Sequence, residues 1–208
     1  MKKQFPLLFA VVAIFLGHTA PVRAQILVNG DFEGSAKPVG MDKVATGFAT
    51  IPGWKDIGTA ANNSGVQYGA PGDALNNSQA GNYFAFQDSD DGNGANRGAY
   101  QITNTVLHAG DQITLTWYAV NTTGTPTQNV NLLAAPAKDA AFDAATVLPP
   151  GNNPVLTLND TYTKYTITYT ATAADAGKYL GVSFRTTGAN NSFVQYDSFV
   201  LTDVAAPK

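Results

Sequence analysis

The stretch Gln112-Ile-Thr-Leu-Thr-Trp-Tyr-Ala-Val-Asn121 decides the fold class of this chain. Its apolar and polar residues alternate one by one, which is the pattern of a β-strand with one buried face. Trp117 shares a face with apolar neighbours, whereas Tyr118 shares the other face with threonines. We therefore expect Trp117 to be buried in a core and Tyr118 to lie on the opposite side of the sheet.

The same alternation recurs along the chain, whereas the apolar spacing of a helix is nearly absent. Many short strands separated by turn residues favour an all-β fold, a two-sheet antiparallel β-sandwich of the jelly-roll type. For Lys138–Thr146, one short helix and an irregular insert both stay open. The expected strands are Ile26–Asn29, Gly47–Ile51, Val66–Tyr68, Asn82–Gln87, Ala99–Thr103, Gln112–Asn121, Gln128–Ala135, Tyr162–Thr172, Tyr179–Thr186 and Phe193–Thr202.

Residues 1–24 have the order of a secretory signal peptide. Lys2 and Lys3 precede an apolar run from Leu7 to Leu16, and Ala24 closes a cleavage site of small residues. The apolar run is too short to span a membrane. We therefore expect a secreted protein, extracellular or periplasmic, in which residues 25–208 form a single β-sandwich domain.

The charge of the chain limits its partners. The whole sequence has 12 basic and 15 acidic side chains. Without Lys2, Lys3 and Arg23, nine basic residues stand against the same 15 acidic ones, so residues 25–208 have a net charge of about −6. Such a surface repels nucleic acids and anionic membranes, so we expect neither as a partner. No second apolar run of about 18 residues follows the leader, so we expect no membrane insertion. The lack of cysteine excludes disulfides and thiol nucleophiles.

Acidic residues stand near both ends of the predicted domain. The stretch 29–33, Asn-Gly-Asp-Phe-Glu, has two carboxylates two residues apart, and Glu33 is the single glutamate of the chain. If this stretch is a strand, Asp31 and Glu33 share one face and Phe32 points the other way. Asp197 stands near the other end, directly before an apolar strand pattern. Terminal strands are commonly neighbours in β-sandwiches, so these acids are expected to meet.

Three motifs resemble those of the galactose-binding-like jelly rolls. They are Asn-Gly-Asp-Phe-Glu at 29–33, Pro-Gly-Trp at 52–54 and the closing Tyr-Asp-Ser-Phe-Val-Leu at 196–201. This family includes carbohydrate-binding modules of secreted bacterial proteins, and the resemblance spans residues 25–208. It implies a carbohydrate-binding-module-like domain whose partner is a carbohydrate polymer or a cell-surface glycan. Members of one fold bind different ligands, so the fold alone does not decide the function.

The resemblance also implies a structural Ca²⁺ where the terminal strands meet. Asp31, Glu33 and Asp197 are its candidate ligands, because Ca²⁺ prefers carboxylate and carbonyl oxygens. A second interpretation stays open, in which Asp31 and Glu33 are solvated turn residues and Asp197 caps a local hydrogen-bond network. A domain without disulfides gains stability from any ion that binds its folded state alone.

A sugar site is typically lined by aromatic side chains with a few polar groups around them. Strand alternation puts Tyr118 among threonines and Gln87 on the face opposite the neighbouring phenylalanines. We predict that Tyr68, Gln87, Tyr118 and Arg185 form one concave ligand-binding cluster. The alternative is a merely amphipathic sheet with a solvated face.

The sequence offers little for catalysis. Residues 25–208 contain one histidine, His108, and no Gly-x-Ser-x-Gly motif. Glycoside hydrolysis requires a pair of carboxylates across a cleft. We therefore expect no enzyme, and predict a secreted non-catalytic carbohydrate-binding protein. The alternatives are a structural or surface-assembly protein without a sugar ligand, and an extracellular hydrolase.

The leader gives the first testable prediction. Export should remove residues 1–24, because their charged, apolar and small-residue segments follow the order that signal peptidase requires. The intact mass of the exported protein is expected to match a chain that begins at Gln25. A mature N-terminus more than a few residues away from Gln25 would contradict this expectation.

Overall fold

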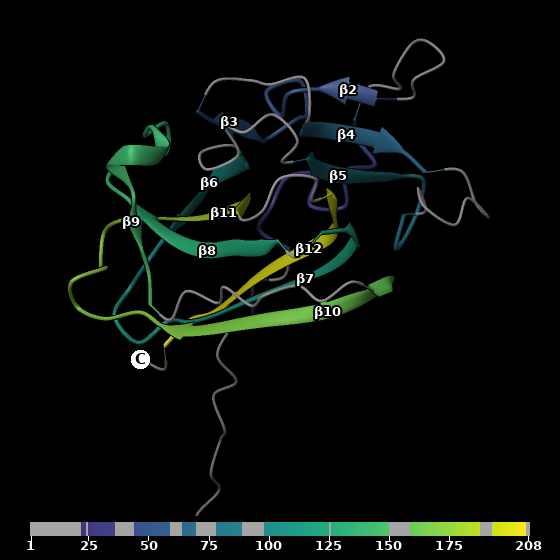
Figure 1. Cartoon of the computed structure of the whole chain (residues 1–208). Helices are drawn as coiled ribbons and strands as arrows, with labels where there is room; N and C mark the ends of the chain where they lie inside the picture. The colour runs from purple at the N-terminus through teal and green to yellow at the C-terminus, as the bar shows by residue number, and fades with distance from the viewer. Residues whose placement is uncertain are drawn as a thin grey trace, which may run out of the picture.

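Antiparallel β-strands account for nearly all the regular structure of the residues that the structure describes (Figure 1). The computed structural model describes residues 22–23, 25–35, 44–58, 64–69, 78–88, 98–124, 126–149, 159–187 and 193–206. Within these ranges the strands are β1 Val22–Arg23, β2 Val44–Thr46, β3 Lys55–Ile57, β4 Ser64–Tyr68, β5 Tyr83–Asp88, β6 Gly98–Val106, β7 Gln112–Thr123, β8 Thr127–Ala135, β9 Thr146–Val147, β10 Asn159–Thr170, β11 Tyr179–Thr187 and β12 Phe193–Val204. One short 3₁₀ helix, η2, spans Phe142–Ala144.

The strands form two sheets. The seven-stranded sheet has the order β10-β7-β12-β5-β4-β2, with β1 paired to β12, and the five-stranded sheet has the order β3-β6-β11-β8-β9. The described residues contain no α-helix. The predicted all-β, two-sheet antiparallel sandwich is therefore confirmed.

The strands expected from Val66 to the C-terminus are confirmed, with shifts of a few residues at their ends. The segment Lys138–Thr146 is irregular apart from η2 and the first residue of β9. The two strands expected nearest the N-terminus are wrong, because both stretches form turns.

The stretch Ile26–Asn29 is not a strand, and it runs into a turn that includes Asn29. This residue and Phe32 have left-handed backbones, with φ of 53° and 60°. Asparagine tolerates that conformation better than most residues. The Asn29 main chain is also fixed from elsewhere, since the indole Nε1 of Trp54 donates to its carbonyl oxygen at 3.0 Å. As a result Asp31 and Glu33 lie in a turn, and the expectation that they share one strand face is wrong.

The stretch Gly47–Ile51 is a turn because two of its main-chain N–H groups donate to a side-chain carboxylate. Asp56 accepts hydrogen bonds from the main-chain N–H of Phe48 at 2.6 Å and of Ala49 at 3.1 Å. Such side-chain acceptors compete with the hydrogen bonds of a strand ladder. The strand on this side is β2, which ends just before Gly47.

The core lies between the sheets and is rich in aromatic rings. Trp117 is 0% exposed, whereas Tyr118 is half-buried on the opposite side of its sheet, so the two-face prediction for β7 is confirmed. The Trp117 ring stacks between Tyr165 of β10, at 5.5 Å, and Phe199 of β12, at 6.2 Å. Phe184 of β11 brings the second sheet to this cluster, with its ring 5.1 Å from that of Phe199.

The short strand β1 lies inside the predicted signal peptide. Its residues Val22 and Arg23 pair with Val204 and Asp203 of β12. The predicted cleavage after Ala24 would remove this pairing, whereas the pairs of β12 with β5 and β7 lie within residues 25–208. Within the described ranges, no helix has the length and apolar character needed to cross a membrane.

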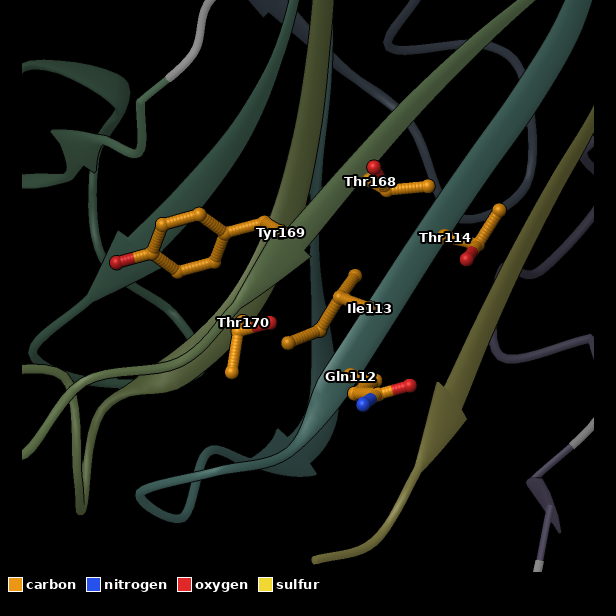
Figure 2. A pocket seen from close by; sticks show the side chains of 6 residues that line it. All are labelled: Gln112, Ile113, Thr114, Thr168, Tyr169 and Thr170. Atoms are coloured by element: carbon orange, nitrogen blue, oxygen red, sulfur yellow. The ribbon is translucent and has the colours of Figure 1, made fainter.

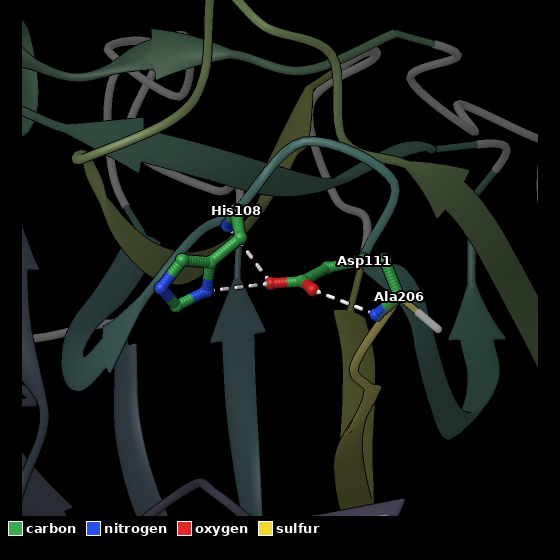
Figure 3. A network of polar contacts seen from close by, with 3 residues as sticks. All are labelled: His108, Asp111 and Ala206. Atoms are coloured by element: carbon green, nitrogen blue, oxygen red, sulfur yellow. Dashed lines mark hydrogen bonds and ion pairs between the residues drawn. The ribbon is translucent and has the colours of Figure 1, made fainter. Parts of the chain in front are cut away.

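A buried carboxylate joins the turn before β7 to the chain after β12 (Figure 3). Asp111 is almost fully buried, and its Oδ2 accepts from the main-chain N–H of His108 at 2.8 Å. Its Oδ1 accepts from the Ala206 N–H at 3.1 Å. Burial alone would raise the pKa of Asp111, but these hydrogen bonds and the His108 imidazole hold that pKa below its usual value.

We expect Asp111→Asn to lower the free energy of unfolding by about 1–3 kcal/mol, as for the loss of hydrogen bonds to a charged group. The folded pKa of Asp111 is depressed, so its contribution is full above the unfolded pKa of about 3.9 and is lost as the pH falls through the folded value. Denaturant melts from about pH 7 down to about pH 2 should show the gap between wild type and variant closing. Asp139→Asn, at an exposed aspartate, is the control. A gap that stays constant over this range would refute the role given to the carboxylate.

Candidate functional site

The side chains of the five-stranded sheet that point away from the core form the candidate site, here called the outer face. In β11, Val182 and Phe184 belong to the core, so alternation turns Ser183 and Arg185 outward. Ser183 pairs with Tyr100 of β6 on one side and with Asn131 of β8 on the other. The outer face comprises Lys55, Ile57, Tyr100, Ile102, Asn129, Asn131, Leu133, Ser183 and Arg185, and Phe142 of η2 lies over part of it. Ile57, Tyr100 and Leu133 are buried on this face as a second apolar cluster, against which Phe142 packs.

Phe142 lies over the outer face because the connection from β8 to β9 folds back onto the sheet; its coil is visible beside β9 in Figure 1. The ring centroid of Phe142 is 5.7 Å from that of Tyr100 and 5.8 Å from Cζ of Arg185. The Nζ of Lys55 lies 5.9 Å from the centroid of the Tyr100 ring. Burial raises the pKa of Tyr100, although a main-chain hydrogen bond with Phe142 works against this. Two aromatic rings and two cations therefore meet on this face.

Two polar atoms of the outer face lack a hydrogen-bond partner. They are Oγ of Ser183, a residue that is 1% exposed, and Nε of Arg185. Most buried polar atoms in native proteins are paired, with protein groups, water, ions or ligands, so each exception needs an explanation. Gly98 stands opposite Arg185 in the register, and a Cβ there would collide with the main-chain oxygen of Phe184 and lie 2.6 Å from the Cβ of Arg185. The missing side chain at Gly98 thus gives Arg185 its room.

The four residues predicted to bind a ligand do not come together. Arg185 lies on the outer face of the five-stranded sheet, whereas the other three belong to the seven-stranded sheet. Tyr118 points out of the opposite side of the sandwich. Gln87 points between the sheets, where its Oε1 accepts from the Thr186 N–H at 2.5 Å. Tyr68 packs against Tyr83 with ring centroids 5.4 Å apart. One concave cluster of these four is therefore wrong, and a binding role for each alone stays a prediction.

The orientation predicted for Gln87 was wrong because the prediction assigned the wrong face of β5 to the core. The prediction took Phe84 and Phe86 as the core side of the strand, but the residue between them, Ala85, belongs to the core cluster. Phe84 is fully buried as well, so both faces of β5 are covered. In such a strand the hydrophobic pattern does not say which face meets the other sheet.

The sequence analysis missed Tyr100, Phe142 and Ser183. Ser183 could have been found, because it alternates with Val182 and Phe184 on the strand that carries Arg185. Tyr100 and Phe142 had no such signal. Their place beside Arg185 follows from the pairing of β6 with β11 and from the path of the β8–β9 connection.

A hollow lies between the ends of two neighbouring strands, β7 and β10, and Figure 2 shows the side chains that line it. It has a volume of about 270 Å³ and is lined by Gln112, Ile113, Thr114, Thr168, Tyr169 and Thr170. The Tyr169 hydroxyl already donates to Asp175 at 2.7 Å. The lining offers threonine hydroxyls but no ionised side chain, so we favour the outer face as the functional site.

The acids Glu33 and Asp197 both hold one turn, residues 78–82. Oε1 of Glu33 accepts from the main-chain N–H of Asn82 and of Tyr83, each at 2.7 Å. Oδ2 of Asp197 accepts from the N–H of Gln79 at 2.8 Å and of Ala80 at 3.1 Å. The two ends of the domain thus meet at this turn, as expected. Asp31 is exposed and instead accepts from the Glu33 N–H at 3.3 Å.

Asp197 is 0% exposed. Burial raises its pKa to about 7, although hydrogen bonds from the main chain of Ala80, Ser198 and Gln79 lower it. N–H donors rather than oxygen ligands therefore face Asp197 and Glu33. In the part of the chain that the structure describes, no three acidic, histidine or cysteine side chains gather as a metal site. The three acids as placed do not form an oxygen cage, and the predicted Ca²⁺ stays a prediction.

No protein-family model matches this chain, and no curated protein matches it. Solved structures are similar to it. The Stig cyclase Fisc from Fischerella sp. TAU, in complex with (3Z)-3-(1-methyl-2-pyrrolidinylidene)-3H-indole, has a TM-score of 0.68 and 23% identity, over 90% of this chain and 100% of that one. A cyclase from the same source, in complex with 4-(1H-indol-3-yl)butan-2-one, has a TM-score of 0.65 and 22% identity, over 89% and 100%. The CBM22-1 xylan-binding domain of Xyn10C from Paenibacillus barcinonensis has a TM-score of 0.49 and 12% identity, over 81% and 100%. At such identities the similarity to the two cyclases is one of fold alone, and it agrees with the two-sheet antiparallel sandwich described above.

Thermal melts test the calcium prediction. If Ca²⁺ binds the folded domain, calcium about 100-fold above its dissociation constant should stabilise it by about 2.7 kcal/mol relative to EDTA. Glu33→Gln and Asp197→Asn should each lose this calcium-dependent shift, whereas Asp139→Asn should keep it. If the wild type melts at the same temperature in EDTA and in calcium, Ca²⁺ does not stabilise the folded domain and the prediction is wrong.

Proposed function

We propose that this protein is a secreted, non-catalytic carbohydrate-binding protein and that the outer face of its five-stranded sheet holds the sugar. The observation that carries the proposal is the pair of unpartnered polar atoms, Oγ of Ser183 and Nε of Arg185, next to the rings of Tyr100 and Phe142. Sugars present hydroxyl groups along their edges and C–H groups on their faces. A site with aromatic surface and a few placed polar groups suits both. Here the half-buried Phe142 supplies the aromatic surface, and the buried Tyr100 supports it.

Binding without catalysis fits the residues of this face. Glycoside hydrolysis uses two carboxylates on either side of the scissile bond. Among the described residues, the carboxylate closest in sequence to Phe142 is Asp143, which is exposed, and Asp56 of β3 is engaged with the main chain of Phe48 and Ala49. Neither arrangement resembles an acid and base pair. The xylan named for the CBM22-1 domain and the indole compounds named for the cyclases belong to those proteins, and the proposal for this chain rests on its own side chains.

Exchange of single aromatic residues on the two sides of the sandwich tests the proposal. A glycan array and pull-down on insoluble polysaccharides first identify a bound sugar. Phe142→Ala should then weaken binding at least about tenfold, as for an aromatic contact residue. Tyr118→Ala, on the other side of the sandwich, should bind as wild type does. Melting curves confirm that both variants fold.

The remaining outcomes have distinct meanings. Loss of binding in Tyr118→Ala but not in Phe142→Ala would move the site to the seven-stranded sheet. No retention by any glycan would overturn the proposal and favour the structural or surface-assembly alternative.

A further inference from the structure

We propose that the ligand of the outer face carries a carboxylate, so that the protein prefers acidic sugars of the uronic acid class over neutral ones. This inference rests on the carbohydrate-binding function proposed above and specifies its substrate class. It depends on the guanidinium of Arg185, the hydroxyl of Ser183 and the charge of the face around them.

The guanidinium group of Arg185 packs near Phe142, and one of its nitrogen atoms has no hydrogen-bond partner. The side chain is half-buried, and its Nε has no hydrogen-bond partner. Its Cζ lies 5.8 Å from the ring centroid of Phe142, which limits the positions open to the group. A guanidinium presents parallel N–H groups that match the two oxygens of a carboxylate. Because Phe142 already orients this fork, less conformational entropy is lost when an anion binds.

Ser183 adds a buried hydroxyl on the same face. It lies two residues before Arg185 on β11, so both side chains point to the same side of the sheet. Its Oγ has no partner, although the residue is 1% exposed. Asn131, directly opposite in β8, is 5% exposed. A buried hydroxyl without an acceptor in the protein is suited to donate to a ligand oxygen.

The charges around the outer face also favour an anion. The chain is acidic overall, with a net charge of −3, yet Lys55 and Arg185 are the charged side chains that β3 and β11 present on this face. Asp56 points to the other side, where it binds main-chain N–H groups. Asp143 of η2 is the nearby carboxylate and is exposed to solvent. Two cations against one solvated carboxylate give a positive local field on an acidic protein.

The test compares one polymer in two forms. Oligogalacturonate and its methyl ester differ in the charge of the carboxyl group, so their affinities for the full mature protein isolate that group. Titration calorimetry should show wild type binding the acid at least about tenfold more tightly than the ester, with the preference falling as salt rises. Arg185→Met, which keeps the length of the side chain, should bind both forms alike. Arg185→Lys should recover part of the preference at most, because an ammonium cannot form the fork.

Controls distinguish the preference for acidic sugars from carbohydrate binding itself. Lys164→Met removes an exposed cation of β10, on the other side of the sandwich, and should leave the preference unchanged. Equal binding of acid and ester by wild type would overturn the inference while leaving carbohydrate binding intact. Equal binding of dextran sulfate and oligogalacturonate would overturn it too, because charge alone would then explain the affinity. Binding of neither form, nor of any glycan, would instead overturn the proposed function.

Discussion

The packing of Phe184 against the opposite sheet is the contact on which the rest of this structure depends. Its ring lies 5.1 Å from Phe199 and meets Phe48 and Trp54 edge-on, each at 5.2 Å. A strand that sends one side chain into the core must send its neighbours outward, and a slip of one residue would exchange the two sets. The core therefore holds Arg185 on the outer face. The candidate site takes its orientation from apolar packing on the other side of the same strand.

Much of the fold could be predicted from period-two alternation, because long strands such as β7 have one face in the core and one outside. The alternation failed where distant groups fix the main chain. Asp56 takes the amides of Phe48 and Ala49, and the Trp54 indole binds the carbonyl of Asn29. Such contacts join segments through the tertiary fold, and local sequence does not encode them. In β5 both faces are buried, so the alternation did not show which face meets the other sheet.

The candidate site was less predictable than the fold. Arg185 was chosen from its own strand and lies on the outer face, but its companions come from other strands. Tyr100 lies beside Ser183 because of the register of β6 against β11. Phe142 lies over the outer face, near Tyr100 and Arg185, because of the path of the irregular β8–β9 connection. Register and loop path depend on the whole assembled sandwich. For this reason a site made across strands could not be read from any single stretch.

The turn at 78–82 has a consequence for how the chain folds. One side of it is held by Glu33, near the start of the domain, and the other by Asp197, in the last strand. A chain that is synthesised from its N-terminus lacks the second support until almost its whole length has been made. Pairings between such distant segments carry a large loop-closure entropy and form slowly. The turn at 78–82 therefore reaches its final state late, once the last strand is available to pack against it.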